Sequence, residues 1–163
     1  MGAPLTPWYG LDAVWRVLLE RDARRTFGDA LRHTLTHREL TYQLDDLDVP
    51  GDPQRRTIRI TFHAQPPYPT YGQQPQDFPR VHATPRARSK HRYPNDDALC
   101  LWHPLDPTDR RWTSGQGLLV LIELIRRHLF LEHWWRQTGT WLLEDAPHGF
   151  GRLDEPGNRR DRT

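Results

Sequence analysis

Two stretches of alternating apolar and polar residues, joined by a strong turn signal, constrain this chain most. Between them, residues 49–53 read Val-Pro-Gly-Asp-Pro, and two prolines with a glycine favour a turn over a continuing strand. Alternation with a period of two predicts strands that bury one face. The two runs therefore predict an antiparallel β-hairpin. Its apolar positions are Leu40, Tyr42 and Leu44 in the first run and Ile58, Ile60 and Phe62 in the second.

Helical periodicity is found on both sides of this hairpin. Residues 11–19 place apolar side chains at helical spacing, which predicts an amphipathic helix of about three turns, and a helical or irregular stretch follows around Phe27 and Leu31. Thr113 and Gln116 have the spacing of a capping box and predict the start of a second long helix that ends near Gln137. That helix is apolar in almost every direction, so we expect it to pack across the sheet.

The rest of the chain predicts one domain with loops and two short ends. The proline-rich segment 65–85 contains a single short strand signal at 80–82, and its aromatic residues favour a packed loop over a linker. We expect an extended N-terminus over 1–10, a folded domain over 11–149 and a disordered tail over 150–163.

Composition argues against several classes of protein. The net charge is only +2, and 22 arginines against the single lysine, Lys90, are scattered among acidic residues, so no nucleic-acid partner is predicted. The longest apolar stretch, 118–135, is interrupted by four charged residues and does not predict a membrane span. No secretory signal is recognisable, and one cysteine cannot form an internal disulfide, which fits a cytoplasmic location.

Cys100 is the candidate for chemistry. Leu99 and Leu101 alternate with Cys100 and Trp102, so the leucines can anchor an extended segment while the thiol lies on its other side, near the surface. A thiolate there is a nucleophile, although a lone cysteine is often only a small buried apolar residue.

Several polar residues lie near Cys100 in sequence. His91 or His103 could raise the thiolate fraction or deprotonate an attacking group, and a Cys-His-Asn hydrolase using Asn95 is conceivable. Zinc is not predicted, because the paired ligand spacing of zinc sites is missing. We expect no metal and no cofactor.

The order of these elements resembles that of ubiquitin-conjugating enzymes. The matching motifs are Tyr68-Pro69, Phe78-Pro79, Tyr93-Pro94-Asn95, Cys100 and Trp112. The end of the chain, 133–149, resembles stand-alone bacterial proteins of this kind, found in antiphage operons that include cyclic-oligonucleotide signalling systems (CBASS). The resemblance implies an α+β fold, with a meander of about four antiparallel strands flanked by helices.

The resemblance also implies a function. Cys100 would carry the C-terminus of a modifier or target protein as a thioester, and a cGAS-like nucleotidyltransferase or a ubiquitin-like modifier would supply that C-terminal tail. A separate activating enzyme is a possible further partner. Asn95 would support the loop or stabilise the developing oxyanion. Two departures from the family motif stand out: Tyr93 replaces its histidine, and Asn95 is closer to Cys100 in sequence. The departures leave open a rival role as an inactive scaffold.

Partner contacts are expected on two surfaces. By resemblance, the first helix with Trp15 would bind the activating enzyme, although the apolar spacing equally predicts that Trp15 packs on the sheet. The arginines that flank the cysteine motif, Arg86, Arg88 and Arg92, would orient the partner's tail, or else be simply solvated.

Overall fold

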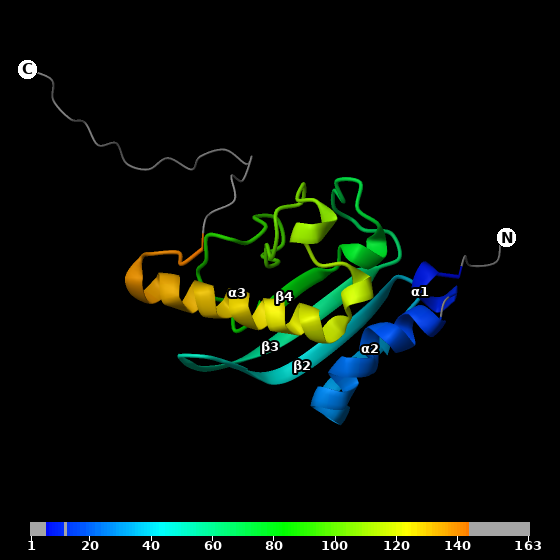
Figure 1. Ribbon diagram of the computed structural model, residues 1–163, viewed down its shortest axis with the longest axis horizontal. Coiled ribbons are helices and arrows are strands. Elements are labelled where there is room, and N and C mark those ends of the chain that lie inside the picture. The colour runs from blue at the N-terminus through cyan, green and yellow to red at the C-terminus, as the bar shows by residue number, and fades with distance from the viewer. Residues whose placement is uncertain (1–5, 12, 144–163) are drawn as a thin grey trace, which may run out of the picture.

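The computed structural model describes residues 6–11 and 13–143 and has an α+β fold (Figure 1). Four strands form one antiparallel sheet in the order β1-β2-β3-β4, as the predicted meander requires. The strands are β1 Leu31–Leu35, β2 Glu39–Val49, β3 Asp52–His63 and β4 Arg80–Thr84. The α-helices are α1 Trp8–Leu11, α2 Ala13–Phe27 and α3 Leu118–Thr138.

The predicted hairpin is the centre of the sheet. β2 and β3 pair with Leu40 opposite Phe62, Tyr42 opposite Ile60 and Leu44 opposite Ile58. All six side chains are buried on one face, as their alternation predicts.

Helices α2 and α3 cover the apolar face of the sheet, and α3 runs across the strands in Figure 1. Leu19 and Ala23 of α2 and Leu121, Ile122 and Ile125 of α3 are completely or almost completely buried in the core that they share with the sheet. Burial of apolar area on this scale is the main stabilising contribution to a domain of this size. No helix in 6–11 or 13–143 is long and apolar enough to cross a bilayer.

The start of α3 follows the predicted capping box. Thr113 and Gln116 exchange side-chain hydrogen bonds with each other's backbone, but the turn they cap is a 3₁₀ turn, Ser114–Gln116. Helix α3 begins at Leu118, directly after Gly117, whose φ of 86° is readily adopted only by glycine.

Four details differ from the sequence predictions. The N-terminal segment is not wholly extended, since α1 begins directly after Pro7, where the first turn of a helix tolerates proline. Helix α2 is longer than predicted and continues to Phe27. Strand β1 replaces the expected helical or irregular stretch around Leu31. Pro53 lies inside β3, beyond the part of β3 that pairs with β4. The expected tail, 150–163, and the expected end of the domain at 149 lie outside the described residues.

Candidate functional site

Cys100 lies at the base of a small hairpin that packs on β4. Its backbone N–H donates to the carbonyl of His91 at 3.0 Å, and Arg92 and Leu99 form an antiparallel bridge. The N–H of Leu99 donates to the carbonyl of Val81 in β4 at 2.8 Å, and the Leu99 side chain is only 4% exposed. Leu99 therefore anchors the segment as the alternation predicted, whereas Leu101 is only partly buried. The position of Cys100 is fixed by backbone pairing.

The thiol of Cys100 is neither fully exposed nor fully buried. Its sulfur lies 3.5 Å from the carbonyl oxygen of Trp102, to which the thiol donates. The next two residues, Leu101 and Trp102, line part of a surface groove of about 220 Å³. The remaining lining residues are Asp109, Arg110, Arg111, Trp112, Gln116, Val120 and Leu124.

A stack of two tyrosines and an arginine lies beside the cysteine. The guanidinium of Arg80 is sandwiched between the rings of Tyr68, at 3.9 Å, and Tyr93, at 4.0 Å. Arg80 is only 7% exposed and forms an ion pair of 3.0 Å with Asp96 in the turn of the small hairpin. Because a cation between two aromatic faces is attracted to both, the stack fixes the Tyr93 ring.

The surroundings of the thiol favour its protonated form. Burial raises the pKa of Cys100 above its ordinary value, and the carboxylate of Asp106 raises it further. Hydrogen bonding from the Tyr93 hydroxyl and the positive charge of Arg80 lower the pKa, but they do not outweigh burial. Cys100 is therefore mostly a neutral thiol at pH 7.

The other residues expected near the thiol lie in different places. Asn95 is exposed in the turn at the tip of the small hairpin, whereas Cys100 is at its base. The ring of His91 packs on Trp141, with centroids 4.3 Å apart, and its backbone carbonyl is the group that binds the N–H of Cys100. His103 caps its own turn, where its Nδ1 accepts from the N–H of Leu105 at 3.2 Å.

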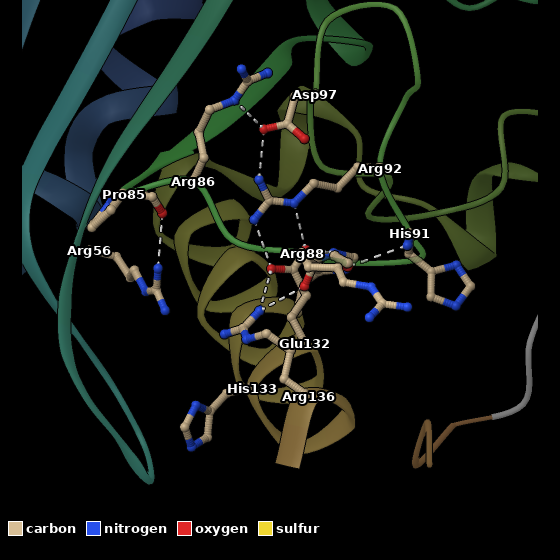
Figure 2. Close-up of polar contacts among 12 residues, drawn as sticks. Arg56, Pro85, Arg86, Arg88, His91, Arg92, Asp97, Glu132, His133 and Arg136 are labelled. Atoms are coloured by element: carbon tan, nitrogen blue, oxygen red, sulfur yellow. Dashed lines mark hydrogen bonds and ion pairs between the residues drawn. The ribbon is translucent and has the colours of Figure 1, made fainter. Parts of the chain in front are cut away.

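Arg92, expected to grip a partner's tail, instead has a structural role. Figure 2 shows its guanidinium between two carboxylates. It donates to both oxygens of Glu132 in α3 at 2.9 and 2.8 Å and to Asp97 at 3.0 Å, and its side chain is only 5% exposed. The charge of Arg92 is therefore already paired inside the protein, and a partner's tail would have to compete with these two carboxylates for it. Arg88 is exposed, with its guanidinium 5.5 Å from the centre of the Trp135 ring.

Trp15 packs on the sheet. Its ring meets those of Trp8 and Phe62 edge to face, with centroids 4.9 and 5.7 Å apart, and it is partly buried. Trp15 therefore packs on the sheet, which is one of the two alternatives that the apolar spacing of the first helix left open. The exposed apolar residues of α2 are Val14, Val17 and Leu18.

No group of three or more potential metal ligands occurs among residues 6–11 and 13–143.

Comparison with protein families finds a match over residues 29–149 to the model of the type II CBASS E2 protein. This match spans most of the chain and includes β1 to β4, Cys100 and α3. The chain belongs to the type II CBASS E2 family. Comparison with curated proteins finds no match. Membership assigns the protein an E2-like role in CBASS antiphage defence, beside the partner proteins of such an operon.

The sequence of this CBASS E2 protein indicated only some of the residues that lie around Cys100. Tyr93 was noticed as a departure from the family motif, but not as a neighbour of the thiol. Arg80 directly follows the Phe78-Pro79 motif, but neither it nor Asp106 was expected to act on the thiol, because that effect arises only in the folded chain. The aromatic residues of the proline-rich segment did predict a packed loop, and two of them, Tyr68 and Phe78, contact the guanidinium of Arg80.

Proposed function

We propose that this CBASS E2 protein carries an acyl group as a thioester on Cys100 and transfers it to an amine. The acyl donor is the C-terminus of a partner protein, for which we propose the cGAS-like nucleotidyltransferase of the same system, with a ubiquitin-like modifier as the other donor of the same chemical class. The observation that carries the proposal is the partly exposed thiol, fixed by backbone pairing beside a groove in a chain of the E2 family.

The reaction has two steps. The Cys100 thiolate attacks the carbonyl carbon of an activated C-terminus, such as an acyl adenylate supplied by an activating enzyme. A C–S bond forms, and the leaving group departs with the electron pair of the broken bond. An amine then attacks the thioester carbon, the C–S bond breaks, and sulfur takes the electron pair while the amine loses a proton.

The raised pKa of Cys100 is compatible with a carrier. A less acidic thiol gives a more basic thiolate, which is a stronger nucleophile once formed and a poorer leaving group. The thioester would therefore resist loss to water while it waits for its acceptor.

The groove after Cys100 supports a path for the donor's tail. It is lined in part by Leu101 and Trp102 and carries the exposed cation Arg110 at its rim. We propose that the last residues of the donor lie along this groove with apolar side chains on Trp102. We also propose that the fold is of the ubiquitin-conjugating type, which the order of strands and helices supports.

Intact mass spectrometry tests the proposal. The protein is purified without reductant from cells that hold its whole operon. We expect an adduct on Cys100 that an added thiol releases by thioester exchange, and Cys100→Ser should carry the same added mass as an oxyester that resists the thiol. Cys100→Ala is the matched control and should carry none. An unmodified Cys100 in such cells, with an intact defence phenotype for Cys100→Ala, would contradict the proposal.

A second candidate function is an inactive scaffold that binds partner proteins. One observation favours it: Asn95 lies at the exposed tip of the hairpin, away from the thiol at its base. In that case Cys100→Ala would retain the partner complex and the phenotype, whereas the carrier loses the phenotype with the adduct.

A further inference from the structure

Tyr93 and Cys100 are neighbours on one face of the small hairpin. The N–H of Tyr93 donates to the carbonyl of Ala98 at 2.8 Å, and the N–H of Cys100 donates to the carbonyl of His91 at 3.0 Å. In an antiparallel pair, these hydrogen bonds place Tyr93 and Cys100 diagonally across from each other, within reach of a long side chain. Hydrogen bonding from the Tyr93 hydroxyl also lowers the pKa of the Cys100 thiol, which agrees with this placement.

The Tyr93 ring cannot easily turn away from the sulfur. Arg80 lies on one face of the ring at 4.0 Å and is itself held by the ring of Tyr68 and the carboxylate of Asp96. The side chain is therefore positioned before any partner arrives.

The charge state of Tyr93 decides what it can do. Burial raises the pKa of Tyr93 well above its ordinary value, and a negative charge on Cys100 raises it further. The phenol therefore keeps its proton over the physiological range and serves as a hydrogen-bond donor instead of a base.

The sulfur needs such a donor only when it is charged. The neutral thiol donates its own proton to the carbonyl of Trp102. A thiolate has no proton to donate and gains from a hydroxyl that points at it, since hydrogen bonds to charged groups are stronger than neutral ones.

We infer that the Tyr93 hydroxyl donates a hydrogen bond to the Cys100 sulfur whenever the sulfur is negatively charged, and that Arg80 positions Tyr93 for this purpose. The stabilised thiolate is the nucleophile in acyl loading and the leaving group in acyl transfer. The role of the thiolate in acyl loading and acyl transfer rests on the proposed function, whereas the effect of Tyr93 on the free thiolate does not.

The rate of Cys100 alkylation by iodoacetamide, measured against pH on the purified chain, tests the inference. Tyr93→Phe removes the donor and keeps the ring, so we expect alkylation at pH 7 to slow about tenfold and the midpoint of the profile to move to higher pH. Tyr68→Phe is the matched control, because Tyr68 stacks on the other side of Arg80 while its hydroxyl donates to the Phe78 carbonyl at 2.8 Å. Its profile should equal that of the unmodified protein.

A profile of Tyr93→Phe that coincides with that of Tyr68→Phe would overturn the inference. Thermal unfolding of both variants is measured to check that each of them is folded. If Tyr93→Phe does not fold, 3-fluorotyrosine is incorporated throughout the Tyr68→Phe chain, which makes the phenol at position 93 a stronger donor. The alkylation midpoint should then fall, and an unchanged midpoint would likewise overturn the inference. Since alkylation requires no acyl donor, these results are independent of whether a thioester is found in cells.

Discussion

Arg92 and Glu132 join the cysteine-bearing hairpin to helix α3 through two hydrogen bonds, at 2.9 and 2.8 Å, between side chains that are 5% and 1% exposed. The two residues are 40 positions apart in sequence. Glu132 also accepts from His128 at 3.1 Å and lies 3.6 Å from Arg136. A buried ionic cluster therefore ties the hairpin that carries the thiol to α3 (Figure 2).

Replacing Arg92 by methionine should destabilise the fold by about 3 kcal/mol, because it leaves the Glu132 carboxylate buried with too little compensation. Urea unfolding followed by tryptophan fluorescence measures the change. Arg88→Met is the control: the Arg88 side chain is exposed, and its loss should cost less than about 0.5 kcal/mol. Equal stabilities for the two variants would contradict the structural role of Arg92.

Stability should fall in acid through Glu132. Burial alone would raise the pKa of Glu132, but hydrogen bonds from His128 and Arg92 outweigh it and hold the pKa at about 2, below the ordinary value of 4.5. Because the folded pKa is the lower one, the stabilisation is fully present above about pH 4.5 and is lost as the pH falls towards 2.

Unfolding free energies measured between pH 6 and pH 2.5 test this dependence. Glu132→Gln should flatten the slope below pH 4.5, whereas Glu123→Gln, at a half-exposed carboxylate of the same helix, should leave it unchanged. The same slope in all three proteins would refute the assignment.

Asp106 should slow the reactions of Cys100 at neutral pH. Its negative charge raises the pKa of the thiol, so Asp106→Asn should lower that pKa and speed alkylation at pH 7 roughly twofold. Asparagine keeps an oxygen that can still accept from the N–H of His103 in the turn. Asp109→Asn, an exposed carboxylate a few residues further on, serves as the comparison, and an equal rate in both variants would argue against the electrostatic effect.

Trp15 should matter for folding before it matters for binding. Its ring packs on Trp8 and Phe62, so Trp15→Ala should cost about 2 to 3 kcal/mol of unfolding free energy. Val17→Ala, at a side chain 64% exposed on the same helix, should cost well under 1 kcal/mol. Thermal melts distinguish the two, and a neutral Trp15→Ala would return Trp15 to the candidates for a partner-binding surface.

The sequence predicted those parts of the fold in which one face is buried. Tyr42 and Ile60 alternate with polar neighbours, so the hairpin was evident. Strand β1 was missed because only Leu31 of its five residues is buried, which leaves no alternation to detect. Helix α1 was missed because residues 1–10 were expected to be extended, although a helix can begin directly after Pro7.

The candidate site was less predictable, because its relations are tertiary. Cys100 was identified from its neighbours in sequence. Whether Arg92 is solvated or buried depends on Glu132, and the effect of Tyr93 on the sulfur depends on the pairing of the small hairpin and on Arg80. Neither spacing nor periodicity contains this information.

The hydrogen bond from Leu99 to Val81 has a consequence for solubility. β4 is an outer strand of the sheet, and unpaired outer strands invite pairing with other molecules. The cysteine segment covers part of this edge, while β1 at the opposite edge presents mostly polar side chains. Detaching the segment would therefore expose the Cys100 sulfur and the edge of β4 together. Substitutions that remove the Arg92–Glu132 contact should thus cause aggregation as well as loss of function.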